Sequence, residues 1–84
     1  DAQVAELADC LLAHPDVAKR VNLGFNRLTD ETGVKLARYV AASSTVEWLS
    51  LHNNQLGSAT YLALAAALRV NTSLRCWTLR GNQA

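Results

Sequence analysis

The chain alternates between two patterns of apolar and polar positions. In segments 20–23 and 48–51 the apolar side chains stand two residues apart, as on the buried face of a short β-strand. Leu49 and Leu51 thus share the inner face of the second strand, and Trp48 lies on its outer face. Each strand is followed by a polar turn, and the first two turns lead into a stretch in which apolar residues recur with the helical period. These patterns predict a chain of alternating strands and helices.

Three helices are expected. The first covers residues 1–14 and ends at His14, because Pro15 lacks an amide hydrogen and restricts the residue before it. The second begins at a cap on Thr29 or Asp30 and ends near residue 42. The third covers about 58–70, with its cap at residue 58. Its predicted inner stripe consists of Leu62, Ala65, Ala66, Ala67 and Leu68.

The strand and its turn recur at a fixed interval. The asparagines of the turns are Asn26, Asn54 and Asn82, so that neighbouring copies are 28 apart. A period of this length is typical of a solenoid, in which a unit buries its apolar face only against its neighbours. Residues 1–84 are therefore interpreted as one domain that consists of helix 1–14, a repeat at 17–45, a repeat at 46–73 and a partial repeat at 74–84.

The segment from Val46 to Leu56 resembles a known family. Its pattern Val-x-x-Leu-x-Leu-x-x-Asn-x-Leu, followed by a helix that closes a unit of about 28–29 residues, is similar to the ribonuclease-inhibitor class of leucine-rich repeats. The resemblance implies a right-handed β-α solenoid with a short parallel sheet on the concave side and helices on the convex side. The class includes repeat regions of nucleotide-binding innate immune receptors, tropomodulin-like actin regulators and the activator of the Ran GTPase, so the resemblance also implies protein binding.

The last repeat departs from this pattern. Trp77 stands where the earlier units carry Val21 and Leu49, and Ala84 stands where leucine is expected. Because a Trp is too bulky for an ordinary inner strand position, we expect the end of the stack to be open or covered by another chain. The 84 residues are interpreted as a piece of a longer solenoid or as a chain that associates with itself through this repeat.

The three asparagines are predicted to be structural. Where a strand bends into its turn, each buried backbone group without a partner costs roughly 1–3 kcal/mol. The side-chain amide of asparagine offers a donor and an acceptor together. We therefore expect Asn26, Asn54 and Asn82 to form a ladder that satisfies the backbone across neighbouring units.

Outward strand positions form columns across the repeats, and these columns are the predicted contact surface for a partner. Trp48 is the leading candidate, because Trp is enriched among interface hot spots. Arg20 is expected to lie over its ring as a cation–π pair, and such a contact either supports binding or only shields the indole. The columns are Arg20, Trp48 and Cys76, then Asn22, Ser50 and Thr78, then Gly24, His52 and Arg80, with Lys19, Glu47 and Arg75 as a flanking column.

Composition and charge narrow the classes of function. Half of the residues are apolar and the formal net charge is +1, which argues against a disordered chain and against a nucleic-acid binder. Residues 1–47 hold seven acids and five bases, a net −2, whereas the rest of the chain carries three arginines and no acid. No segment has the length and apolarity of a membrane span or the form of a signal peptide. Cys10 and Cys76 lack metal-ligand spacing and are expected to be free thiols of an intracellular, cytoplasmic protein.

The predicted function is a protein-interaction or scaffolding module that presents its concave strand surface to a protein partner. We expect no enzymatic activity, cofactor or metal, and His14 and His52 fall in different parts of the repeat. One alternative is a regulatory accessory such as a GTPase activator, in which Arg27 would reach toward a phosphate. Another is a structural element that associates with itself through the uncovered last repeat.

Overall fold

The computed structural model describes residues 2–82 of the chain, and side chains from residue 6 onward. Its helices are α1 (Ala2–Ala13), α2 (Asp30–Ala42) and α3 (Ser58–Val70), and its strands are β1 (Arg20–Asn22), β2 (Trp48–Ser50) and β3 (Cys76–Thr78). Helices and strands alternate along the chain, which confirms the predicted α/β class. The strands β1 and β2 each end one residue earlier than expected, and α1 ends at Ala13, one residue before the predicted end.

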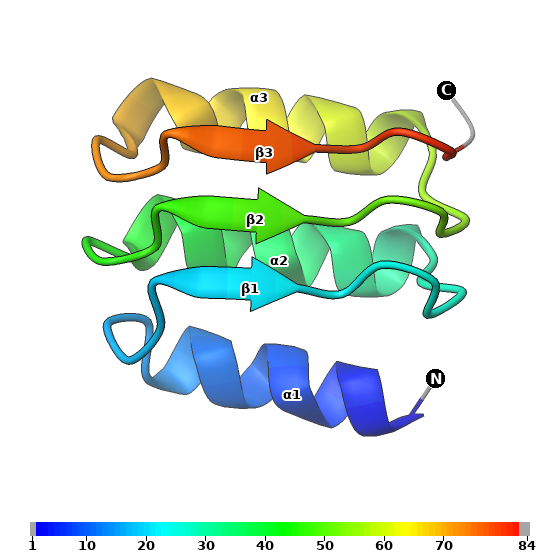
Figure 1. Cartoon of the computed structure of the whole chain (residues 1–84), viewed down its shortest axis with the longest axis horizontal. Helices are drawn as coiled ribbons and strands as arrows, with labels where there is room; N and C mark the ends of the chain where they lie inside the picture. The colour runs from blue at the N-terminus through cyan, green and yellow to red at the C-terminus, as the bar shows by residue number, and fades with distance from the viewer. Residues whose placement is uncertain (1, 83–84) are drawn as a thin grey trace.

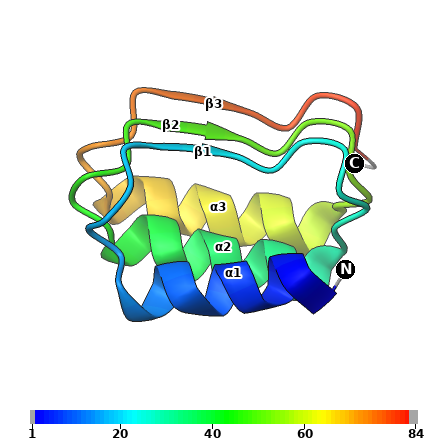
Figure 2. The same ribbon diagram turned by 60° about the horizontal axis from the view of Figure 1, so that its bottom comes forward.

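The three strands form one parallel sheet in the order β1-β2-β3. The register joins residues that are 28 apart, so that Arg20 pairs with Trp48 and Trp48 pairs with Cys76. Figures 1 and 2 show that α1, α2 and α3 all lie on one face of this sheet. No described segment covers the other face, which we call the outer face.

The hydrophobic core lies between the sheet and the helices. Every second strand residue points into it, and Leu49 and Leu51 are 1% and 0% exposed. Leu36, Tyr39 and Val40 of α2 meet these side chains and are also fully buried. Burial of apolar surface is the main favourable contribution to folding. Tyr39 is the largest of the fully buried side chains in this core.

Asp30 links α2 to the start of α3. Its Oδ1 accepts the backbone N–H of Gly57 at 2.8 Å, and it also accepts hydrogen bonds from the N–H and hydroxyl of Thr60. Gly57 occupies the N-cap position of α3, so the prediction of Ser58 as the cap is wrong. At α2 the N-cap is Thr29, whose side chain makes no capping bond. A carboxylate of one unit thus caps the helix of the next unit.

The predicted inner stripe of α3 is largely wrong. Leu62 is 72% exposed because α3 packs against α2 on one side and no described element covers its other side. Ala65 and Ala66 are exposed as well. The buried residues of α3 are Thr60, Leu64 and Ala67.

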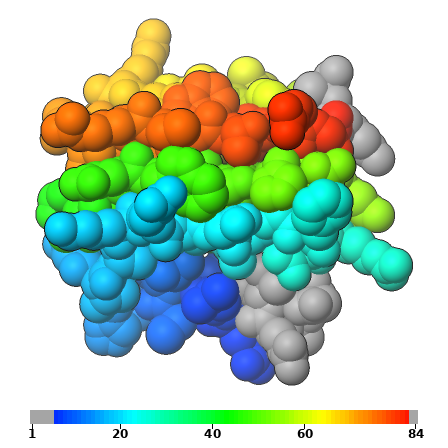
Figure 3. Space-filling view, viewed as in Figure 1, coloured from blue at the N-terminus to red at the C-terminus, as the bar shows by residue number. Residues whose placement is uncertain are grey.

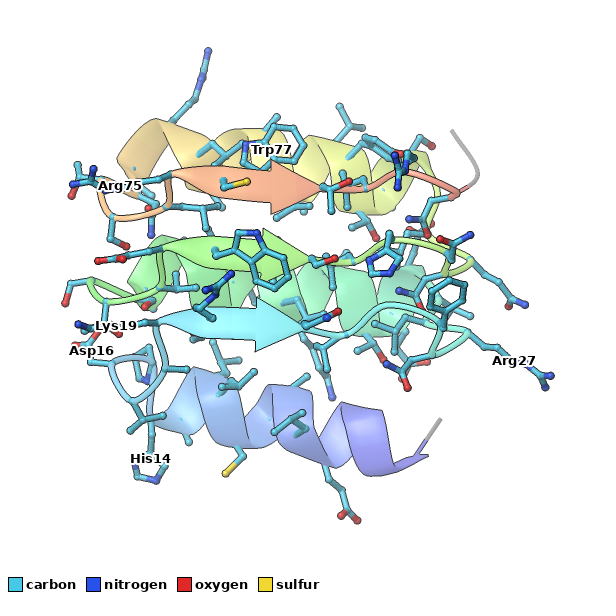
Figure 4. The ribbon with its side chains drawn as sticks, in the orientation of Figure 1. His14, Asp16, Lys19, Arg27, Arg75 and Trp77 are labelled. Atoms are coloured by element: carbon cyan, nitrogen blue, oxygen red, sulfur yellow. The ribbon has the colours of Figure 1, made fainter. Side chains whose placement is uncertain are left out.

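The edge strand β3 is the least covered part of the sheet. Trp77 lies in register with Leu49, yet it is 48% exposed, and Figure 4 shows it beside α3 at the edge of the sheet. Its bulk therefore meets no steric barrier within the described part of the chain. The expectation about residue 84 lies outside the described residues.

Candidate functional site

The outer face of the sheet brings the predicted columns together. The register aligns Arg20 with Trp48 and Cys76, and it aligns Asn22 with Ser50 and Thr78. Beyond the strands, backbone hydrogen bonds from Phe25 to His52 at 3.0 Å and from Asn53 to Arg80 at 2.8 Å continue the alignment. The resulting surface faces the viewer in Figure 3.

Trp48 and Arg20 form a pair at the amino end of this surface. The guanidinium carbon Cζ of Arg20 lies 5.0 Å from the centroid of the indole ring, within the range of a cation–π interaction. Trp48 is partly buried, whereas Arg20 and the neighbouring Cys76 are exposed. Arg20 therefore covers one face of the indole and keeps its own charge in contact with solvent.

His52 forms the centre of a second cluster at the carboxyl end. Its ring meets the ring of Phe25 edge to face, with centroids 5.0 Å apart and planes at 89°. The ring also lies directly over Gly24, since a Cβ at this glycine would overlap the Cε1 atom of the imidazole. Only glycine leaves room for the imidazole here. This contact explains why residue 24 is a glycine, which the column pattern alone does not explain.

Ser50 does not belong to the contact surface. It was predicted to meet a partner, but it is only 1% exposed, and a short hydrogen bond joins its Oγ to Nδ1 of His52. Alternation assigns Ser50 to the outer face, and its larger neighbours cover it. Its hydroxyl instead lies beneath the surface and bonds the imidazole of His52.

Charged side chains are unevenly distributed over the outer face. Lys19, Arg20, Arg75 and Arg80 are exposed cations, and Glu47 is the single anion among the positions of the four columns. Figure 4 shows Lys19 and Arg75 at the same end of the strands. The ion pair present in the described part of the chain joins Lys35 to Asp9 on the helices at 2.9 Å, so none of these four cations is paired within residues 2–82.

Asn54 bonds the backbone of the preceding unit. Its Oδ1 accepts the N–H groups of Asn26 and Leu28 at 2.9 and 3.0 Å. Its Nδ2 donates to the carbonyls of Leu23 and Leu51 at 2.9 and 3.0 Å. Donor and acceptor groups of this buried amide are thus both satisfied.

The other two asparagines make fewer such bonds. Asn82 accepts the N–H of Leu56 at 3.0 Å and donates to Leu51 and Leu79. Asn26 donates to Gly24 of its own unit at 3.1 Å. The three side chains are therefore connected through backbone groups and not directly to one another.

The remaining candidate side chains for metal binding or catalysis lie apart from one another. Within residues 2–82, no group of three or more His, Cys, Asp or Glu side chains is placed to hold a metal ion. Cys10 and Cys76 are both free and exposed. Arg27 sits in a turn at positive φ, and Figure 4 shows it pointing away from the molecule. Asp30 is the carboxyl whose pKa is lowered, first by the hydroxyl of Thr60 and then by the N–H of Gly57.

Two shallow, mainly apolar grooves lie beside the helices. One, of about 280 Å³, runs between α2 and α3 and is lined mainly by alanines, with Arg38 at its side. The other, of about 240 Å³, lies between α1 and β1 and is lined by Leu7, Leu11, Val21 and Leu23, together with Arg20 and Asn22 of the outer face.

Sequence reasoning missed Phe25 as part of the surface. Its backbone adopts φ 60°, which is uncommon for a large residue, and the ring is 73% exposed. The sequence did contain one indication of this cluster, because Gly24 stands at the position that His52 occupies in the next repeat.

Within residues 2–82, no helix has the length and apolarity that crossing a membrane requires. Comparison of the chain with models of known protein families, with curated proteins and with solved structures found no match.

Proposed function

We propose that this protein binds another protein through the outer face of its sheet, with Trp48 and Arg20 at the centre of contact. The observation that carries the proposal is the cation–π contact between the Arg20 guanidinium and a partly exposed indole, on a face that no described segment covers. Trp and Arg are among the residue types most enriched in interface hot spots. Two side chains that are already in contact also lose less side-chain entropy when a partner binds.

The proposal includes a leucine-rich repeat architecture of the ribonuclease-inhibitor class. The pairing of residues 28 apart supports it, as does the bonding of Asn54 and Asn82 to the preceding unit. Parallel strands stack about 4.8 Å apart and helices about 8–10 Å apart, so a continued stack of such units curves with its strands on the concave side. The outer face would then be the concave wall of a right-handed solenoid.

Peptide selection with matched Trp variants tests the proposed function. The immobilised chain is used to select binders from a random peptide display library, and each selected peptide is titrated against wild type, Trp48→Ala and Trp77→Ala. We expect Trp48→Ala to weaken binding at least about tenfold, as hot-spot truncation does. Trp77→Ala removes the same residue type from the other side of the sheet and should leave affinity unchanged. Circular dichroism establishes that each variant is folded.

Two results would contradict the proposal. One is that the selected peptides bind Trp48→Ala as tightly as wild type. The other is that Trp48→Ala loses its fold, because the indole would then serve stability and not recognition.

A second candidate function is self-association through the uncovered edge of β3. The exposed fractions of Trp77 and Leu62, 48% and 72%, favour it. Light scattering over a range of protein concentrations, compared with Trp77→Ser, tests this function. A molecular mass that stays at one chain for both proteins would exclude it.

A further inference from the structure

The charges of the outer face specify the chemistry of its partner, provided that the proposed function holds. Four exposed cations and one anion give the columns a net charge of +3 before His52 is counted. The cations stand at both ends of the strands. Lys19, Arg20 and Arg75 lie near the amino ends, and Arg80 follows the carboxyl end of β3. Because none of them has an ion-pair partner within residues 2–82, their charge is available to a ligand.

Arg20 is placed to receive a carboxylate. The guanidinium carries its N–H groups in a planar fork that matches a carboxylate bidentately, and the cation–π contact with Trp48 limits where this fork can lie. Its Cζ lies 5.0 Å from the centroid of the Trp48 indole, and the side chain is exposed, so that its outward N–H groups are open to a ligand.

The floor between the two cationic ends is neutral and partly aromatic. It is formed by Trp48, Thr78, His52 and the adjoining ring of Phe25, with Ser50 buried beneath. Arg80 stands four rows beyond the row of Arg20, about 13 Å along the strands, and two strands away from it, about 10 Å across the sheet, so that the diagonal between the two positions is about 16 Å. An extended peptide that lies along this diagonal covers the distance with about five of its own residues.

We propose that the partner presents an acidic segment: an extended stretch with carboxylates about five residues apart and an apolar side chain between them. One carboxylate binds the fork of Arg20, the other binds Arg80, and the apolar side chain rests on Trp48 and His52. Over the three described strands and about six residues, the face covers roughly 300 Å², which is enough to seat an extended segment.

A single-stranded nucleic acid fits the same surface less well. Its binding depends on bases that stack on open aromatic faces beside a continuous basic groove. Arg20 already occupies one face of Trp48, and the cations stand at two ends and not along a groove. The surface therefore favours a protein segment, and an oligonucleotide serves as a competing probe.

Fluorescence titration tests the inference. The chain has two tryptophans, so Trp77→Phe leaves Trp48 as the single reporter. The probe is a peptide with a central Leu-Ala pair flanked at each end by Asp and Glu, so that its outermost acids are five residues apart, and its control replaces every acid by the corresponding amide. We expect the acidic peptide to bind at least about tenfold more tightly than the amide peptide at low salt, and to lose most of this advantage at high salt, where ionic screening is strong.

Matched arginine variants locate the effect. Arg20→Gln and Arg80→Gln should each weaken the acidic peptide several-fold. Arg38→Gln removes the same charge from the helix side of the molecule and should have no effect. Equal weakening by Arg38→Gln would show a general charge effect and overturn the inference, as would equal binding of the acidic and amide peptides. Tighter binding of a short oligothymidine than of the acidic peptide would overturn it too.

The outcomes separate this inference from the proposed function. If library peptides depend on Trp48 but carry no excess of acids, the proposed function stands and the inference fails. If no selected peptide depends on Trp48, both fail.

Discussion

The strands β2 and β3 carry the same pattern one repeat apart, yet they differ in how much of it is buried. Leu49 of β2 is 1% exposed, and its partner in register, Trp77 of β3, is 48% exposed. The difference arises because β2 has a strand on each side and β3 has one. In this fold a side chain is therefore buried by the neighbouring units and not by its own unit.

Helices α2 and α3 show the same effect. Ala37 of α2 is 3% exposed because α3 packs against it, whereas Ala65, at the same position of α3, is exposed. The same residue type at the same position of the repeat therefore contributes differently to stability in the middle unit and in the last described unit. Substitutions at equivalent positions measure that difference directly.

The largest expected effect is the truncation of Leu49. Leu49→Ala should lower the free energy of unfolding by about 2–5 kcal/mol, because it leaves a cavity between two strands and α2. Trp77→Ala removes more atoms but should cost only about 1–2 kcal/mol, since half of its side chain is already in water. Urea denaturation monitored by circular dichroism measures both. If Leu49→Ala does not fold, Leu49→Val, with an expected cost of about 1 kcal/mol, replaces it.

This prediction is contradicted if the two alanine variants are equally destabilised. In that case Trp77 would contribute through its exposed surface as much as Leu49 does in the core.

The asparagines should follow a graded order. Asn54→Ala leaves the N–H groups of Asn26 and Leu28 and the carbonyl of Leu23 without their side-chain partner, at an expected cost of about 2–4 kcal/mol. Asn82→Ala frees fewer groups and should cost about 1–2 kcal/mol, and Asn26→Ala should cost less than either. Midpoints of thermal unfolding rank the three variants. An equal shift for Asn26→Ala and Asn54→Ala would show that the bonds between units carry no special weight.

The alternation of strands and helices and the fixed offset between units were predictable, because three in-phase copies of one pattern define both period and register. The surroundings of each position in the folded chain were not predictable. Periodicity places Leu62 on an apolar stripe, but it does not say whether an element covers that stripe. Alternation assigns Ser50 to the outer face, but it does not show that larger neighbours bury it. An acidic residue in the first turn of a helix interacts favourably with the dipole of that helix, which is a sufficient reason for Asp30 to stand there. The sequence alone therefore did not reveal that Asp30 caps the helix of the next unit.

The cap that Asp30 provides should make stability depend on acid pH. Its pKa is below the ordinary value because the hydroxyl of Thr60 and the N–H of Gly57 stabilise the carboxylate. A lowered pKa contributes stability that is present above the ordinary carboxyl pKa, about 3.9, and is lost as pH falls through the folded value. The urea midpoint of Asp30→Asn should therefore lie below that of wild type at neutral pH and approach it under acid conditions.

Glu31→Gln is the matched control for this series. It removes the same charge from the first turn of α2, and no hydrogen bond joins Glu31 to α3 in the described part of the chain. A gap between wild type and Asp30→Asn that is constant from neutral to acid pH would contradict the role of the carboxylate as a cap.

The smallest effect is expected at Tyr39, where α2 again differs from α3. The ring is 0% exposed and fills the space that Ala67 fills in the next unit, so the large side chain itself is needed. Its Oη makes no hydrogen bond of normal geometry within the described residues, and burial raises the pKa of the hydroxyl more than the nearby side chain of Ser43 lowers it. Removing a buried polar group that has no partner costs nothing and relieves its desolvation. Tyr39→Phe should thus leave the unfolding free energy within about 0.5 kcal/mol of wild type or raise it, whereas Tyr39→Ala should lower it by several kcal/mol. A clear loss of stability in Tyr39→Phe would show that the hydroxyl has a partner in solution.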